Sequence, residues 1–326
     1  MDDTTGIGIS GMKAVDLFCG AGGLSLGFKQ AGWEIVAAFD NDPSAVEVYH
    51  CLVGAEAELA DVRELTAADI PDTDAIIGGP PCQPYSLAGK RLRSADPRDG
   101  LPDFLRLVLE VRPPIAVMEN VPLLESAPEF AHFVEVLQGA GYAVDWRILN
   151  AADYGVPQTR RRLFLIALRD EKRVPARAWP FPTHTRHTGL FTDQWISAGS
   201  VLLPLLEMRR PDADRLPRWI ESRWWQVPDH LRDEVLIHQQ LTTKNGKRDY
   251  LDVCPLALPA FTVTVSLVQR NAFVVHGGRY WRIGKREGTI LQGLPFLLGI
   301  TAKHIGNAVP PLLAQRLGEA LKDRRV

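Results

Sequence analysis

The chain has 326 residues, of which 46% are hydrophobic and 23% charged, and its formal net charge is −2. This is the composition of an ordinary globular protein, and no apolar run approaches the roughly 18 residues of a membrane span, so we expect no membrane association. The first ten residues lack the pattern of a secretory signal and the four cysteines lack CxxC spacing, which favours a cytoplasmic protein without zinc or disulfides.

Through residue 169, short apolar runs alternate with segments of helical periodicity. Strands are expected within 13–23, 33–40, 74–81, 115–122, 142–151 and 161–169, and helices within 24–32, 43–52, 102–114 and 130–141. The first strand runs into a glycine-rich turn. Strands that alternate with helices predict an α/β fold with a doubly wound, mostly parallel sheet.

From about residue 173 the alternation stops. One helix is expected within 197–208, followed by short β-like runs at 260–268, 271–277 and 279–284, and an amphipathic helix at 304–322 closes the chain. We therefore expect one domain from 1–178 with 298–326, and a smaller, irregular, β-rich domain over 179–297. Residues 1–150 hold 10 basic and 23 acidic residues (−13), and residues 151–326 hold 27 and 16 (+11). This asymmetry suggests a polyanionic partner, although a solvated basic face would have the same composition.

The first motif is the loop "DLFCGAGGLSLGF" at 16–28, with glycines at 20, 22 and 23. A glycine turn before a helix lets backbone N–H groups approach a ligand, and Asp40, at the end of the second strand, suits a ribose. A tight turn without ligand remains the alternative. A nicotinamide dinucleotide fits poorly, because the spacing is not G-x-G-x-x-G.

Three further features follow strand ends. Cys82 stands on a rigid turn after two glycines and two prolines, Glu119 ends an apolar strand, and Arg160 and Arg162 enter the last strand. A poorly solvated carboxyl has a raised pKa and can hold a proton, and paired guanidinium groups suit a carbonyl oxygen or phosphate. All of these ends meet at one edge of a doubly wound sheet, where ligands bind in such folds.

With these blocks in this order, the chain resembles the DNA cytosine-C5 methyltransferases nearly from end to end. The matching stretches are "DLFCGAGGLSLGF", "FDNDPSA", "ADV", "GGPPCQPYS", "MENV", "NAADYGVPQTRRRLFLIA", "RIGKREGTILQGLP" and "HIGNAVPPLLAQRLG". The resemblance implies a Rossmann-like fold that binds S-adenosylmethionine (SAM). It departs from the family at Asp40, where Glu is more usual, and this shortens the reach to the ribose.

The resemblance also implies the chemistry. Cys82 would add to C6 of a flipped-out cytosine and make C5 nucleophilic, Glu119 would stabilise charge at N3, and Arg162 with Arg160 would hold O2 and phosphate. Phe18 would stack on the cofactor, Asp40 would take the ribose hydroxyls, Asp61 and Val62 would meet the adenine, and Asn307 and Ala308 would come from the returning segment. The remaining expected cofactor residues are Gly20, Gly22, Gly23, Leu24, Asn41 and Pro80.

Double-stranded DNA is the implied partner. A loop over residues 86–100 would close on it, with Ser86, Lys90, Arg91 and Arg98 meeting phosphates. Region 175–290 would read bases in the major groove. The candidates there are Arg209, Arg210, Arg218, Arg223, Lys244, Lys247, Arg248, Arg270 and Arg279.

Three alternatives remain open: a tRNA cytosine-C5 methyltransferase of the same architecture, a catalytically silent DNA-binding module, and a nicotinamide oxidoreductase. The size suits a monomeric bacterial or phage modification enzyme, with or without a cognate restriction endonuclease. The sequence does not reveal the DNA site that is recognised.

Overall fold

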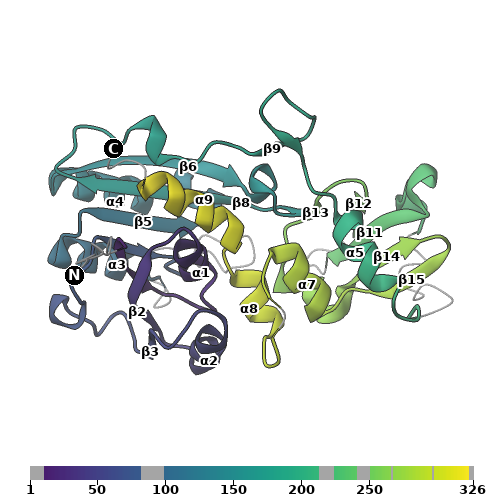
Figure 1. Cartoon of the computed structure of the whole chain (residues 1–326), viewed down its shortest axis with the longest axis horizontal. Helices are drawn as coiled ribbons and strands as arrows, with labels where there is room; N and C mark the ends of the chain where they lie inside the picture. Colours follow the sequence, from purple (N-terminus) through teal and green to yellow (C-terminus); the bar gives the residue numbers. More distant parts are fainter. Residues whose placement is uncertain are drawn as a thin grey trace, which may run out of the picture.

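The computed structural model describes residues 11–81, 99–212, 224–240, 250–265, 267–295 and 297–322. These residues form a large lobe around a seven-stranded sheet and a smaller lobe around a four-stranded sheet (Figure 1). Within the part that is described, no helix combines the length and the apolar character that crossing a membrane requires.

The large sheet confirms the predicted α/β class. Its strand order is β3-β2-β1-β4-β5-β8-β6, in which β5 pairs antiparallel with β8 and β8 with β6, while the other pairs are parallel. The strands are β1 (Lys13–Leu17), β2 (Glu34–Asp40), β3 (Ala57–Leu59), β4 (Ala75–Gly78), β5 (Ile115–Asn120), β6 (Tyr142–Asn150) and β8 (Arg161–Arg169).

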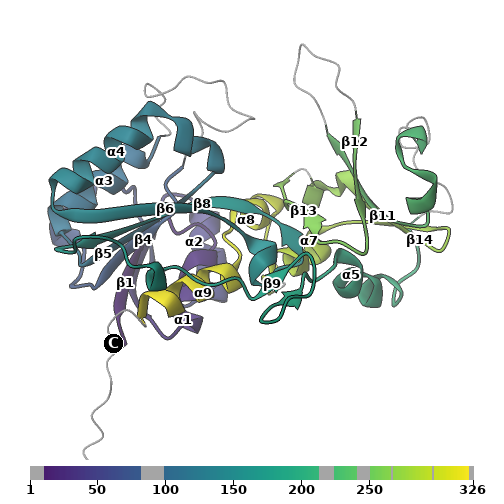
Figure 2. The same ribbon diagram turned by 90° about the horizontal axis from the view of Figure 1, so that it is seen from above.

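Helices cover both faces of this sheet, as Figure 2 shows for α3 and α4 on one side and α1 and α9 on the other. The helices are α1 (Gly23–Gln30), α2 (Pro43–Leu52), α3 (Leu101–Val111), α4 (Pro128–Gly139) and α9 (Pro311–Lys322). Neighbouring strand residues point to opposite faces, so Ala14 packs in the core with α1 and α9 and Val15 in the core with α3 and α4. Burial of both faces explains why the central strands β4 and β5 are mostly apolar.

The smaller lobe contains an antiparallel sheet of order β12-β11-β14-β15, and helices α5 and α7 contribute to its core. Its elements are β11 (Glu234–Gln240), β12 (Tyr250–Pro255), β14 (Ala272–His276), β15 (Arg279–Arg282), α5 (Ala198–Leu206) and α7 (Lys285–Gln292). A short parallel pair, β7 (Gln158–Thr159) with β13 (Ala260–Phe261), joins the two lobes.

Two expectations from the sequence were wrong in detail. The run 260–268 is a strand over Ala260–Phe261, where it pairs with β7. The ladder ends there because Thr262 Oγ1 donates to the Thr159 carbonyl and Val263 N–H donates to the Gln158 side chain, and a π-helix follows at Leu267–Asn271. The expected terminal helix is two helices, α8 (Ala302–Asn307) and α9. Pro310 lies between them and Pro311 is the first residue of α9, since proline has no N–H to continue a helix.

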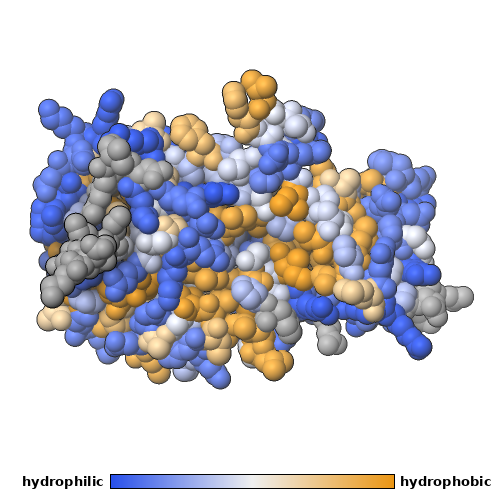
Figure 3. All heavy atoms as spheres, viewed as in Figure 1, coloured by the Kyte–Doolittle hydropathy of each residue, from blue (hydrophilic) through white to orange (hydrophobic). Residues whose placement is uncertain are grey.

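An arm between the lobes carries the short strands β9 (His184–Thr185) and β10 (Asp193–Gln194). Its tip is apolar, and Leu190 and Phe191 are both 90% exposed; Figure 3 shows this hydrophobic tip at the top of the molecule. The arm therefore adds little to either core.

Candidate active site

The strand order reverses between β1 and β4, so a crevice forms at the carboxyl ends of these strands. A cavity of about 1190 Å³ lies there, lined by residues after β1, β2, β4 and β5, by Arg160 and Arg162, and by the returning segment 303–309. Single small-molecule pockets measure about 300–1,000 Å³. The cavity thus has room for more than one ligand group.

The glycine loop forms the floor of the cavity. Phe18, which lines it, has a positive φ of 59°, a conformation that non-glycine residues adopt rarely and mostly at functional sites. Gly20 also has a positive φ, and a Cβ there would meet no atom within 4 Å, so a ligand can approach its backbone. At Gly23 a Cβ would lie 2.2 Å from the Val309 carbonyl oxygen, so this glycine lets the returning segment pack on α1. Helix α1 starts without a side-chain cap.

The acid at the end of β2 holds the loop in place. Asp40 accepts hydrogen bonds from the backbone N–H groups of Gly20 (2.8 Å) and Asp42 (2.9 Å), one on each carboxylate oxygen. Asp61 lines the cavity too, and its carboxylate pairs with Arg63, whose Nε lies 2.9 and 3.0 Å from its two oxygens. Asp42 in turn pairs with Lys303 of the returning segment at 2.6 Å.

Asp16 is a site residue that the sequence analysis did not assign. Asp16 lines the cavity and is fully buried; its Oδ2 accepts a hydrogen bond from Ser25 Oγ at 2.6 Å, and its Oδ1 has no hydrogen-bond partner in the structure. Burial raises the pKa of Asp16 to about 7, and the nearby Asp40 carboxylate adds to the rise. The sequence signal that could have identified Asp16 is an acidic residue inside an apolar strand, directly before the glycine loop.

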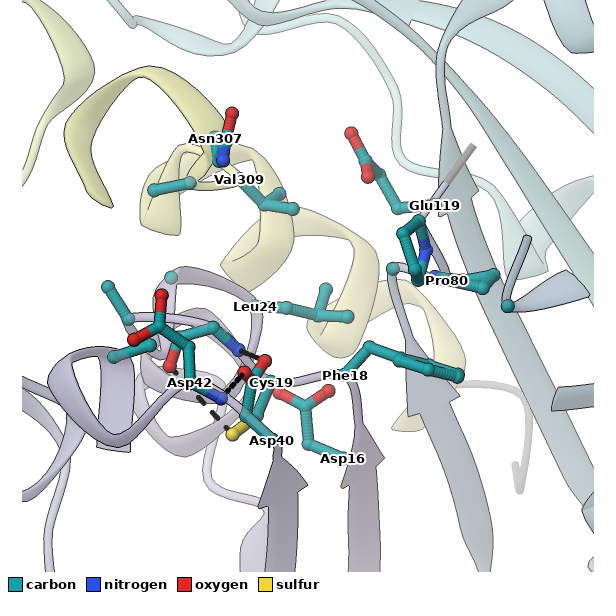
Figure 4. A pocket seen from close by; sticks show the side chains of 18 of the residues that line it. Asp16, Phe18, Cys19, Leu24, Asp40, Asp42, Pro80, Glu119, Asn307 and Val309 are labelled. Atoms are coloured by element: carbon teal, nitrogen blue, oxygen red, sulfur yellow. Dashed lines mark hydrogen bonds between the residues drawn. The ribbon is translucent and has the colours of Figure 1, made fainter. Parts of the chain in front are cut away.

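The opposite side of the cavity holds Glu119 and the turn after β4 (Figure 4). Glu119 is only 8% exposed, and Arg162 Nε lies 3.1 Å from its Oε1, an ion pair without the alignment of a hydrogen bond. Burial raises the pKa of Glu119, while Arg162 and Arg160 oppose the rise. A Cβ on Gly79 would lie 3.3 Å from Glu119 Oε2, so the turn passes directly beside this carboxyl.

Asn120, a second residue that the sequence analysis missed, fixes this turn. Its Nδ2 donates a hydrogen bond to the Pro80 carbonyl at 3.1 Å, and the Gly100 N–H donates to the Pro81 carbonyl at 3.1 Å. Both residues that precede Cys82 are therefore held. Cys82 itself lies outside the described residues, as do Ser86, Lys90, Arg91 and Arg98.

Arg160 and Arg162 both line the cavity but have different surroundings. Arg160 is 1% exposed, and its two Nη atoms donate hydrogen bonds to the carbonyls of Val263 and Gly306, each at 3.1 Å. Burial lowers the pKa of Arg160 to about 9, with a further contribution from Arg162. Arg160 thus braces three chain segments, and Arg162 is the guanidinium that contacts Glu119.

Most predicted cofactor residues meet in this one cavity: Phe18, Gly20, Gly23, Leu24, Asp40, Asn41, Asp61, Pro80, Asn307 and Ala308. Two do not border it. Gly22 has a φ of 85° and abuts Tyr49 and Val53, and Val62 is buried in the core beneath α3.

Of the predicted DNA-contacting residues, Arg209 bonds to Glu287 Oε1 at 2.9 Å, to Asp212 and to the Arg282 carbonyl. Arg210 and Arg279 are exposed. The side chains of the other candidates lie outside the described part of the chain, namely Arg218, Arg223, Lys244, Lys247, Arg248 and Arg270.

The charges divide the cavity into two ends. Asp16 and Asp40 lie beside the glycine loop, whereas Glu119, paired with Arg162, lies across the cavity beside the Pro80 turn. The first end suits a ligand with positive charge and hydroxyl or amino donors. The second offers a carboxyl with a raised pKa beside a guanidinium, which suits a group that takes up a proton and negative charge.

Comparison with known proteins agrees with this geometry. The family model for C-5 cytosine-specific DNA methylases matches residues 12–323. The type II methyltransferase M.FnuDI of Fusobacterium nucleatum is 30% identical, with 96% of this chain and 96% of the relative covered. M.DdeI of Desulfomicrobium norvegicum is 39% identical, with 95% and 88% covered.

Among solved structures, the Dnmt2 methyltransferase of S. pombe has a TM-score of 0.69 at 19% identity, with 96% of this chain and 99% of that chain covered, a likeness in fold. The family match over nearly the whole length and the curated relatives lead to one conclusion: the chain belongs to the C-5 cytosine-specific DNA methylases and is a DNA (cytosine-5)-methyltransferase.

Proposed function

We propose that this enzyme transfers the methyl group of SAM to C5 of a flipped-out cytosine in a specific duplex DNA sequence, through a covalent bond between Cys82 and C6. One observation carries the proposal. The Glu119–Arg162 pair and the anchored turn that leads to Cys82 border the same cavity as the glycine loop. A carboxyl with a raised pKa and the turn that precedes Cys82 in the sequence therefore stand opposite the glycine loop.

The acidic end of the cavity fits SAM, which carries an ammonium and a sulfonium group and supplies an electrophilic methyl group. Asp16 has a buried oxygen without a partner at the cavity wall, which suits the ammonium. Asp40 already accepts two backbone N–H groups, but each carboxylate oxygen retains a second lone pair for a ribose hydroxyl. The open backbone face of Gly20 and the uncapped start of α1 suit the carboxylate.

The adenosine would contact the remaining lining residues. We assign Asp61 to the adenine amino group, Phe18 to stacking, and Asn307 and Ala308 to the wall that closes the pocket. Leu24, Asn41 and Pro80 complete this lining. Gly22 and Val62 would support it from behind, since neither borders the cavity.

Cysteine addition solves the central chemical problem, because C5 of cytosine is a weak nucleophile. When the Cys82 thiolate bonds to C6, electron density moves into the ring and C5 becomes enamine-like. Glu119, whose pKa burial raises, would hold a proton at N3, and Arg162 would stabilise charge at O2. After transfer, loss of the C5 proton lets the sulfur leave.

Access to C5 and C6 requires that the base leave the duplex, at a cost of about a few kcal/mol. We propose that Ser86, Lys90, Arg91 and Arg98 contact DNA phosphates, and that 179–297 is the recognition domain beside a catalytic domain of 1–178 with 298–326. The relatives are named type II methyltransferases. By extension we place this enzyme in the cytoplasm as a monomer; a cognate restriction endonuclease in the same system would require no contact with it.

Trapping with 5-fluorocytosine tests the mechanism, because fluorine at C5 prevents release of the enzyme. Duplex DNA in which 5-fluorocytosine replaces cytosine should form a stable adduct with Cys82 in the presence of SAM. The Cys82→Ser variant should form no adduct. Bisulfite sequencing of host DNA would then identify the site. Methylation of tRNA in place of duplex DNA would support the RNA enzyme, and specific DNA binding without an adduct would support a silent module.

A further inference from the structure

A run of buried amides connects the smaller lobe to the returning segment of the cavity. Val263 N–H donates a hydrogen bond to Gln158 Oε1 at 2.8 Å, and Gln158 Nε2 donates to Gln292 Oε1 at 2.6 Å. Gln292 Nε2 in turn donates to the carbonyl of Ala308. Both glutamine side chains are fully buried.

The groups at the two ends of this run determine how both glutamine amides are oriented. Val263 offers a backbone donor, so Gln158 must present its oxygen there and its NH₂ group toward Gln292. Gln158 Nε2 also donates to the Leu291 carbonyl at 2.9 Å, which excludes the flipped amide. Gln292 must then present its NH₂ group to the Ala308 carbonyl, because a carbonyl only accepts.

The run acts on a residue of the cavity wall. Arg160 Nη2 donates to the Gly306 carbonyl at 3.1 Å, and Gln292 donates to the carbonyl of Ala308, so the carbonyl groups of both residues that flank Asn307 are held. Asn307 is exposed and lines the cavity. The segment cannot shift easily, since a Cβ on Gly306 would lie 2.6 Å from Val265 N.

We propose that Gln292, oriented by Gln158, is a positioning residue that sets the Asn307–Ala308 wall for the cofactor. The inference rests on the proposed function, in that SAM is taken to occupy this end of the cavity. Loss of the Gln292 amide leaves the buried Ala308 carbonyl unpaired, and the wall moves to find another partner. Cofactor affinity then falls, while Glu119, Arg162 and the Cys82 turn keep their own anchors.

The test is Gln292→Met, which keeps the length of the side chain and removes its hydrogen bonds. We expect the Kd and KM for SAM to rise about tenfold, with kcat and DNA affinity within about twofold of wild type. Gln292→Glu should weaken SAM binding further, because a carboxylate oxygen would face the Ala308 carbonyl. Thr289→Val is the matched control: Thr289 is buried in the same helix but bonds within it, to Arg286. It should leave the KM for SAM unchanged.

The outcomes separate the two proposals. Wild-type protein that does not bind SAM overturns the proposed function. If wild type binds SAM and Gln292→Met binds it equally well, or if Thr289→Val raises KM by the same factor, the positioning role is wrong and the proposed function stands. Should Gln292→Met not fold, Gln158→Met gives a second measurement. It removes the partner that orients Gln292, and an unchanged KM for SAM there would refute the inference.

Discussion

Asp16→Asn is the substitution for which the structure permits the most quantitative prediction. Burial raises the folded-state pKa of this carboxyl from 3.8 to about 7. Because the folded value lies above the unfolded value, native protein keeps a proton that unfolded protein has released. The stability from this proton is complete below about pH 4 and is lost as pH rises to about 7.

The magnitude follows from the width of that window. Each pH unit between the two pKa values changes the free energy of unfolding by about 1.4 kcal/mol, so raising the pH from 5 to 7 costs wild type about 3 kcal/mol through this group. An asparagine stays neutral and can still accept the Ser25 hydrogen bond. The stability of Asp16→Asn relative to wild type should therefore rise by about 3 kcal/mol between pH 5 and 7 and then level off.

Urea unfolding at pH 5, 6, 7 and 8 and constant ionic strength, without cofactor, measures this difference. Asp42→Asn is the control, because hydrogen bonds from Lys303 and Ser44 lower the pKa of Asp42, and its titration falls below this range. A difference between Asp16→Asn and wild type that stays constant from pH 5 to 8 would refute the reasoning. With SAM, wild-type affinity should increase toward pH 7 as Asp16 ionises, and Asp16→Asn should lose that dependence.

Three further predictions concern neighbouring parts of the site. Asn120→Leu removes the hydrogen bond to the Pro80 carbonyl. Steady-state methylation assays should show kcat lowered about tenfold or more with unchanged SAM affinity. An unchanged kcat would exclude a role for Asn120 in placing the turn. Glu119→Gln should lower the methylation rate about 10²-fold while DNA binding persists in a gel-shift assay, and a rate of this variant within twofold of wild type would contradict the assigned role. The activity of the wild-type enzyme should fall as pH rises through the raised pKa of Glu119. Gly23→Ala places a Cβ 2.2 Å from a backbone oxygen and should destabilise the fold by about 1–3 kcal/mol in thermal unfolding. Gly20→Ala meets no atom within 4 Å, so its cost to stability should be limited to the backbone strain of its positive φ, about 1–2 kcal/mol, and it should in addition weaken SAM binding; wild-type SAM affinity in Gly20→Ala would count against a ligand contact at this backbone.

The elements of the large lobe were predictable because their signals are local. Continuous apolar runs such as 115–118 are stable as strands when both faces of the sheet are covered, and the glycine and proline turns follow such runs closely in the sequence. The order of the motif blocks can likewise be read directly from the sequence, and that order identified the family. The break between α8 and α9 was equally local, since Pro310 and Pro311 mark it, although the amphipathic pattern obscured it.

Only the tertiary structure decided what most of the polar residues do. Arg160 and Arg162 look equivalent in sequence, yet Arg160 bonds to carbonyls 103 and 146 residues away, while Arg162 pairs with Glu119. Gln158 and Gln292 are 134 residues apart, and neither has a neighbour that would predict the contact. Side-chain hydrogen bonds depend on which distant segments the packing of the cores brings together, and that information is absent from local periodicity. The sequence alone thus determined the strands, the motif order and the family, and the packing determined which polar group meets which.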